Sequence, residues 1–362
     1  MGPYCVWLAA VPVLDGLFQH LRGNPSGKKR QYSLIMALLL VLLLGLRHPS
    51  MGIDLGYGMP YGYLPSFREL SGLSWKNLLS LESYQNYERG YLLFNKLVGC
   101  ICREPQFFLL CCAAAAVLPI GTVIGKHSAD CRLSFLIWFG LTVFQIPFSG
   151  LRQAIAVAVT FWGFSYVKER KPILYLAVVA LASLFHRTAL VAGLVYPLYG
   201  IRLDRAGRLV SIGLLPLLFL LRSRLWNWII QLAGRGTPAV SSGDVGLFVL
   251  FCAVYCYLVL FAPEKGTLDG LINIQYLSCC ILIFTEVSTV ALRVGYYTML
   301  YLTLTLPDLL QQIRRRLGYR EYILHLWLVA GGFVAFGFYN LLHSAWAGAY
   351  PYYFYWESIP LW

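Results

Sequence analysis

The sequence predicts an all-α, polytopic integral membrane protein. Hydrophobic residues occupy 59% of the 362 positions, charged residues occupy only 12%, and the mean hydropathy is +0.64. One soluble core of this length could not bury so much apolar surface. Apolar stretches of about 15 to 20 residues also recur along nearly the whole chain, and a helix of that length crosses the hydrocarbon layer. Since backbone groups in hydrocarbon must bond within their own segment, each stretch is expected to be a helix.

About twelve transmembrane helices are expected from these stretches. They are centred on residues 3–19, 33–47, 106–124, 133–148, 152–167, 172–186, 188–201, 208–222, 245–262, 271–291, 294–310 and 322–340. The first stretch lacks the basic start of a secretory signal and contains Asp15, so we expect it to be an uncleaved helix.

The distribution of basic residues predicts the orientation. If the loop around Lys28 is cytoplasmic, the loops on its side hold the larger share of the 29 Lys and Arg residues, and both termini are expected on the outer side. This topology accounts for the net charge of +13. No nucleic-acid recognition motif accompanies that charge, so the expected partners are membrane lipids and lipid phosphates, not nucleic acid.

The chain is expected to form a single transmembrane domain over residues 1–362, with extracytoplasmic loops at 48–105 and 222–244. The longer loop combines Gly, Pro, Tyr and charged residues, which is typical of an ordered loop and not of a disordered linker. Within it, residues 74–83 suit a short amphipathic helix on the membrane surface. No internal repeat is visible, which disfavours an inverted-repeat transporter.

Four arginines and a histidine are predicted to gather at the outer end of the bundle. They stand at the outer ends of the second, fifth, sixth and tenth segments: Arg47, Arg152, His186 with Arg187, and Arg293. A single terminal arginine can extend to the headgroups, but several on one face indicate an anionic ligand. Guanidinium groups bind phosphate oxygens in pairs and keep their charge. The cluster therefore predicts a lipid pyrophosphate site, where such charges would stabilise a departing pyrophosphate.

Acidic residues are scarce on the predicted outer side. Asp54 and Glu88 stand among Gly and Tyr residues, a setting that suits sugar binding because aromatic faces stack on pyranose rings. A loop cap or a solvated acid is the alternative interpretation for each.

Glu286 is expected inside the tenth helix, about two turns before Arg293 and on nearly the same face. Tyr296 and Tyr297 would continue that stripe along the cavity. A helix-packing hydrogen bond is the competing interpretation for Glu286.

Five stretches of the chain resemble one known family. In chain order they are "GLRHPSMGID", "YERGYLLFNKL", "SGLRQAIAVAV", "LASLFHRTAL" and "LRVGYYTMLYLTLTLP". Together they resemble the EpsG-like family of bacterial exopolysaccharide and O-antigen polymerases, the Wzy-type enzymes, over roughly residues 30–310. The most specific part of the resemblance is Arg152–Gln153 with His186.

The resemblance implies a membrane-embedded glycosyltransferase of the GT-C type. Such an enzyme would polymerise oligosaccharide repeat units carried on undecaprenyl pyrophosphate at the outer face of the bacterial cytoplasmic (inner) membrane. Its expected partners are a lipid-linked donor, a lipid-linked acceptor, membrane lipids and a protein that regulates chain length. No cofactor and no metal are expected, because arginines would supply the positive charge.

Roles for individual residues follow from the same resemblance and from the predicted topology. The expected pyrophosphate ligands are Arg152, Arg293, Arg47 and Arg187. His186 is expected to transfer a proton or to make a further phosphate contact, with Glu88 or Asp54 as the alternative base. The expected substrate-binding residues are Gln153, Tyr91, Tyr296, Tyr297 and Glu286.

Two other activities fit the same pattern. A flippase or exporter of lipid-linked oligosaccharide would also need arginines, but it requires a polar path to both leaflets. The sequence indicates ordinary basic loops, and no second cluster of buried charge, at the cytoplasmic ends of the helices. A ligase of the O-antigen type would transfer a finished glycan in one addition.

Overall fold

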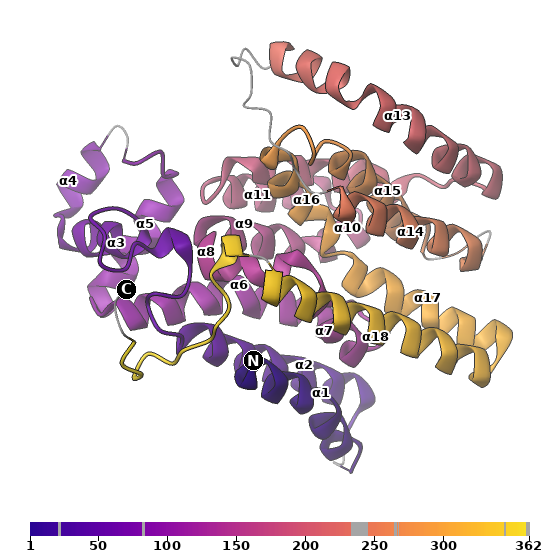
Figure 1. The fold of residues 1–362 in the computed structure, drawn as a ribbon, viewed down its shortest axis with the longest axis horizontal. Coiled ribbons are helices and arrows are strands. Elements are labelled where there is room, and N and C mark those ends of the chain that lie inside the picture. Colours follow the sequence, from indigo (N-terminus) through magenta and orange to yellow (C-terminus); the bar gives the residue numbers. More distant parts are fainter. Residues whose placement is uncertain are drawn as a thin grey trace.

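The protein is helical throughout, which confirms the predicted all-α class. The computed structural model describes residues 1–20, 23–81, 84–232, 245–263, 266, 268–343 and 345–359, and this part of the chain contains no strand, only one isolated β-bridge between Arg47 and Phe354. The helices pack side by side, and α3, α4 and α5 gather at one end of the bundle, at the left of Figure 1.

The first predicted segments form continuous helices. They are α1 (Gly2–His20), α2 (Pro25–Gly45) and α6 (Pro105–His127). The α2–α6 contact is close because Gly121 has no side chain: a Cβ there would lie 2.6 Å from the Cβ of Ala37. Ser33 uses this proximity and donates a hydrogen bond of 2.6 Å to the Gly121 carbonyl.

The long predicted loop between α2 and α6 is largely helical. It contains η1 (Ile53–Leu55), α3 (Tyr63–Gly72), α4 (Trp75–Ser80) and α5 (Arg89–Ile101). The short helix expected at residues 74–83 is therefore present as α4, and Ser74 caps it by accepting a hydrogen bond from Asn77 N–H. Lys96 of α5 is buried and donates to the carbonyls of Ser71 and Leu73, so α5 holds α3 in place.

Several later segments are broken into shorter helices. The first set is α7 (Cys131–Gly140), η2 (Thr142–Gln145), α8 (Ile146–Ser149), α9 (Leu151–Trp162) and α10 (Phe164–Lys168). The next set is α11 (Pro172–Ser183), η3 (Arg187–Leu194), α12 (Val195–Gly200), α13 (Arg205–Leu232) and α14 (Gly246–Phe261). The last set is α15 (Asp269–Leu282), α16 (Thr289–Met299), α17 (Leu302–Leu317), α18 (Tyr319–His343) and η4 (Ala345–Ala347).

These breaks change the predicted number of spans. Among the described residues, α6, α13 and α18 are long and apolar enough to cross a membrane, and the pair α7–α8, bent by 77°, makes a fourth if counted as one span. The chain thus has the character of a membrane protein, but the expected number of about twelve spans is not confirmed. The shorter pieces fall below the roughly 20 residues that a bilayer requires of a single straight helix.

The second predicted loop also begins later than expected. Helix α13 continues through Leu232, so residues 222–232 are helical. The remainder of that loop, 233–244, lies outside the described residues.

The end of the chain folds back onto its beginning. Tyr4 donates a hydrogen bond of 2.5 Å to the carbonyl of Ala349, and Tyr352 donates one of 2.6 Å to the carbonyl of Leu43. The start of α1, the end of α2 and the segment after α18 therefore lie at the same end of the bundle.

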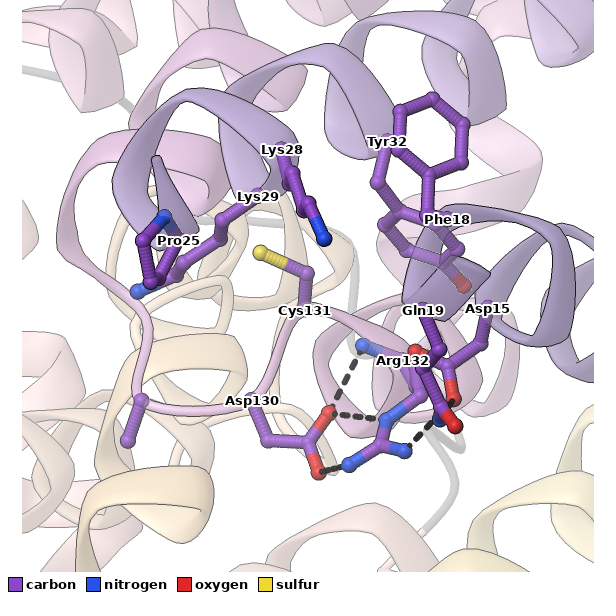
Figure 2. A pocket seen from close by; sticks show the side chains of 11 residues that line it. Asp15, Phe18, Gln19, Pro25, Lys28, Lys29, Tyr32, Asp130, Cys131 and Arg132 are labelled. Atoms are coloured by element: carbon purple, nitrogen blue, oxygen red, sulfur yellow. Dashed lines mark hydrogen bonds and ion pairs between the residues drawn. The ribbon is translucent and has the colours of Figure 1, made fainter. Parts of the chain in front are cut away.

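A charged cluster marks the opposite end of α1. Arg132 bonds to Asp15 at 2.8 Å and to Asp130 at 2.7 Å, and Asp130 also caps α7 (Figure 2). We call these three residues the opposite-end cluster. They line a cavity of about 460 Å³ together with Lys28 and Lys29. The cluster joins α1 to the start of α7.

Candidate active site

A cavity of about 410 Å³ brings together much of the predicted site, and we call it the site cavity. It is bounded by η1, α3, α8, α9, α16, η4 and the connection before η3. Six of the predicted site residues line it: Asp54, Arg152, Gln153, His186, Arg293 and Tyr296. They come from four separate stretches of the chain, so the predicted convergence of Arg152, His186 and Arg293 is observed.

Arg152 is held in place on several sides. It stands in the first turn of α9, and its Nη1 lies 2.5 Å from Glu88 Oε2 and 3.2 Å from the Asn86 carbonyl. Its guanidinium group lies 4.4 Å from the ring centroid of Tyr87, a cation–π contact. Glu88 does not line the cavity, but its other oxygen accepts the backbone N–H of Arg187 at 3.1 Å. Glu88 therefore links α5 to both Arg152 and the segment that carries His186.

Of the two arginines that line the site cavity, Arg293 is the one whose guanidinium group is more available to a ligand. Its side chain is exposed, and within the described part of the chain its guanidinium group makes no hydrogen bond or ion pair. Its backbone carbonyl accepts a hydrogen bond of 2.6 Å from Gln153 Nε2. Gln153, which we expected to bind substrate, thus uses its amide nitrogen to hold α16 against α9.

His186 is neutral at physiological pH. Burial lowers the pKa of its imidazole to about 4, and the charges of Arg152 and Arg293 act in the same direction, against the opposing effect of Glu88. Its Nδ1 lies 2.7 Å from Thr188 Oγ1, which donates to the hydroxyl oxygen of Tyr297 at 3.2 Å. Nδ1 also accepts a hydrogen bond from the backbone N–H of Thr188 at 3.4 Å, so Nε2 is the ring nitrogen that can exchange a hydrogen bond with a ligand.

Asp54 presents an exposed carboxylate to the site cavity. Partial burial raises its pKa, while Arg293 and Arg152 act to lower it. Its place in η1 depends on the backbone at Gly52, where φ is +116° and a Cβ would lie 2.0 Å from the Phe148 carbonyl oxygen. Only glycine fits this conformation and this contact, so the residue before η1 lets Asp54 reach the cavity.

Arg47 corrects one of our predictions. Its side chain is fully buried and donates to the carbonyls of Leu44, Met51, Pro147 and Phe148, at 2.6 to 3.3 Å. Its guanidinium group is therefore satisfied by backbone oxygens and does not line the site cavity. Arg47 joins the end of α2 to α8 and supports the fold in place of binding pyrophosphate.

Four other predicted residues lie outside the site cavity. The side chain of Arg187 is exposed, and Tyr91 is buried among Tyr63, Tyr87 and Phe94. Tyr297 is buried behind Thr188. Glu286 stands in the break between α15 and α16, not inside a helix with Arg293, and it pairs with Arg222 of α13 at 2.5 Å, which agrees with the competing interpretation of a packing hydrogen bond.

Other residues that line the cavity were missed by sequence reasoning: Tyr63, Ser149, Thr289 and Trp346. Tyr63 contacts Arg152 Nε at 3.5 Å and belongs to the Gly- and Tyr-rich loop, which was the available signal. Trp346 belongs to an aromatic-rich stretch after α18. Its place in the cavity depends on the return of that stretch to α2 and α8, which no local pattern predicts.

A third cavity, of about 380 Å³, lies at the far ends of α6 and α10, and it contradicts our expectation that buried charge is absent from that side. His127, Lys168, Asp269 and Asp308 are among the residues that line it. Asp269 forms a buried ion pair with Arg208, at 2.5 Å. Buried charge is therefore present at both ends of the bundle.

The EpsG family model matches residues 31–354, a range that includes every residue of the site cavity. The chain matches no curated protein and no solved structure.

Proposed function

The chain belongs to the EpsG family, and on that premise we propose that it polymerises oligosaccharide repeat units carried on undecaprenyl pyrophosphate. Membership of the family indicates a polysaccharide polymerase-type glycosyltransferase. The Wzy type of reaction, the GT-C class and the outer face of the bacterial cytoplasmic membrane are further parts of the proposal. The distribution of Lys and Arg among the loops supports that orientation.

The observation that carries this proposal is the pair of guanidinium groups in one cavity. Arg152 is balanced by Glu88, whereas Arg293 has no matching carboxylate within hydrogen-bond distance among the described residues. A pyrophosphate would supply the missing negative charge, and the fork of N–H donors on each arginine suits its oxygens. The two arginines stabilise the pyrophosphate most strongly as it departs, because its negative charge then increases.

The reaction needs one bond to form and one to break. The bond between the anomeric carbon of the donor sugar and the pyrophosphate oxygen breaks, and its electron pair leaves with the pyrophosphate. A hydroxyl oxygen of the acceptor sugar bonds to that carbon and gives up its proton. Asp54 is the base we assign, because its carboxyl group faces the cavity.

The role that we propose for His186 differs from the proton transfer or phosphate contact expected from the sequence. With a pKa of about 4 it is uncharged during turnover, so it adds no positive charge for a phosphate. Its imidazole instead exchanges a hydrogen bond with a substrate oxygen, and Thr188 holds the ring in position. On this proposal arginines take the role of a divalent cation, so chelators leave the activity unchanged.

The test is polymerisation by the purified chain in lipid vesicles that contain the lipid-linked repeat unit of the producing bacterium. A ladder of products is expected. The Arg152→Ala variant should lose the ladder, whereas Arg187→Ala, whose side chain lies outside the cavity, should keep it. Folded protein is compared by size-exclusion chromatography. Elongation by Arg152→Ala at the wild-type rate would contradict the proposal.

A flippase for the same lipid is the second candidate, favoured by the charged cavity at the far ends of α6 and α10. The product distinguishes the candidates. A polymerase yields a ladder, a ligase yields a single addition, and a flippase moves the lipid across the vesicle membrane without forming a new bond. A protein that regulates chain length would alter the length of the ladder but not its presence.

A further inference from the structure

We propose that Trp346 and Asp54 form a sugar-binding subsite that holds the acceptor sugar beside the two cavity arginines. This inference rests on the proposed function, because it assigns the acceptor of that reaction to one wall of the site cavity. Both residues line the same cavity as Arg152 and Arg293.

The indole of Trp346 has the exposure that a stacking surface needs. It is 36% exposed, although it stands beside the charged groups of the site cavity. Core packing leaves no such surface open, as Trp138, at 1% exposure, illustrates. The C–H face of a pyranose ring is apolar and covers an aromatic ring, while its hydroxyl groups point outward to polar partners.

A single hydroxyl group joins the two parts of the subsite. Ser149 Oγ accepts a hydrogen bond from Ile53 N–H at 3.0 Å and donates one to the Ala347 carbonyl at 2.7 Å. Ile53 and Ala347 are the chain neighbours of Asp54 and Trp346. Ser149 of α8 therefore fixes the backbone beside the carboxylate and the backbone beside the indole at the same time.

The segment that carries Trp346 is also held firmly from its other side. Gly348, with φ at +59°, passes so close to η1 that a Cβ would lie 2.8 Å from Gly52 N. The next residue, Ala349, accepts the hydrogen bond from Tyr4. A stacking surface fixed in this way loses little conformational entropy when a ligand binds.

The two walls of the cavity then have separate tasks. The carboxylate of Asp54 accepts hydrogen bonds from sugar hydroxyls and takes the proton of the reacting one, while Trp346 covers the apolar face of the ring. Arg152 and Arg293 hold the pyrophosphate of the donor. The acceptor hydroxyl is thereby directed toward the carbon that carries the pyrophosphate.

The experiment uses two probes and the full chain in nanodiscs. One probe is the repeat-unit oligosaccharide of the producing bacterium, released from its lipid and free of phosphate. The other is undecaprenyl pyrophosphate without sugar. Calorimetry measures the affinity of each probe for the wild type, Trp346→Ala, Trp346→Phe and Arg293→Ala. Trp356→Ala is the matched control, because Trp356 is also exposed and lies in the same segment but not in the site cavity.

Trp346→Ala should weaken oligosaccharide binding about tenfold, as loss of an aromatic contact does, and leave undecaprenyl pyrophosphate binding unchanged. Trp346→Phe should recover most of the affinity, and Arg293→Ala should show the opposite selectivity. Equal oligosaccharide affinity in Trp346→Ala and Trp356→Ala would overturn the subsite and leave Trp346 a contact for lipid headgroups. No oligosaccharide binding to the wild type would overturn it as well. If undecaprenyl pyrophosphate fails to bind while the Trp346 effect persists, the pyrophosphate site of the proposed function fails and the sugar subsite stands.

Discussion

Arginines at the two ends of the molecule have different partners. Arg132 in the opposite-end cluster bonds to Asp15 and Asp130, whereas Arg293 in the site cavity bonds to no other side chain of the described residues. A cation already matched by two carboxylates gains little from a further anion, while an unmatched cation that lines a cavity remains free to attract one. The partners, and not the residue type, separate an arginine that joins helices from one that is available to a ligand.

The largest expected effect is on turnover. Arg293→Ala should reduce the rate of polymerisation by about 10²- to 10³-fold, the loss typical when one group that stabilises developing charge is removed. Arg132→Ala should retain nearly the full rate per folded molecule, because its guanidinium group lies in the opposite-end cluster. Rates are measured in vesicles, normalised to folded protein. An equal loss of polymerisation rate in the two variants would show that the site cavity has no special role for its unmatched arginine.

A smaller effect is expected in the dependence of the unfolding free energy on pH. Burial lowers the pKa of His186 to about 4 in the folded protein, while the unfolded chain has the ordinary value of about 6.5. As the pH falls below about 6.5, the unfolded chain binds a proton that the folded chain does not, so stability is lost between pH 6.5 and 4. At pH 5 the loss is about 2 kcal/mol.

This loss is measured as the difference in unfolding free energy, or in thermal midpoint, between pH 7 and pH 5. His186→Gln should remove most of the difference. His20→Gln, in which an exposed histidine at the far end of α1 is replaced, should behave as the wild type. Parallel curves for the wild type and His186→Gln would show that another group causes the pH dependence.

The smallest effect is expected in the stability of the opposite-end cluster. The side chain of Arg132 is 44% exposed, so solvent screens its two ion pairs. Arg132→Ala should therefore lower the unfolding free energy by only about 0.5–1 kcal/mol. Denaturation in detergent, compared with Lys28→Ala in the same cavity, measures this change. A loss of several kcal/mol would mean that the cluster governs folding of the whole bundle.

Much of the architecture could be predicted because membrane helices follow from apolar length alone. Helices occur in each of the twelve predicted stretches, although the stretch 271–291 is interrupted between α15 and α16, and the family resemblance is confirmed. The breaks were not predicted, because the bend after Gly140 and the interruption at Glu286 lie inside segments that are apolar on average, and the few polar residues there do not by themselves interrupt a membrane helix. Tertiary contacts stabilise such breaks, and a hydropathy pattern does not contain them.

The residues of the candidate site could be predicted where a polar side chain interrupts an apolar stretch. Arg152, His186 and Arg293 are polar residues at the ends of apolar stretches, and they do share a cavity. Arg47 has the same sequence pattern, yet its donors are taken by carbonyls at Pro147 and Phe148, far away in the chain. Trp346 escaped prediction for the converse reason, since it enters the site only through distant contacts.

The docking of residues 349–355 on α1 and α2 has a consequence for biosynthesis. His48 N–H donates to the Tyr353 carbonyl and Tyr355 N–H donates to the Leu46 carbonyl, at 2.8 and 2.9 Å. These hydrogen bonds can form only after α18 has been synthesised, well after the residues that contain Asp54 and Arg152. During synthesis the helices α1 to α18 are therefore made before Trp346 can reach the site cavity, so the proposed acceptor subsite is the last part of the site to be completed.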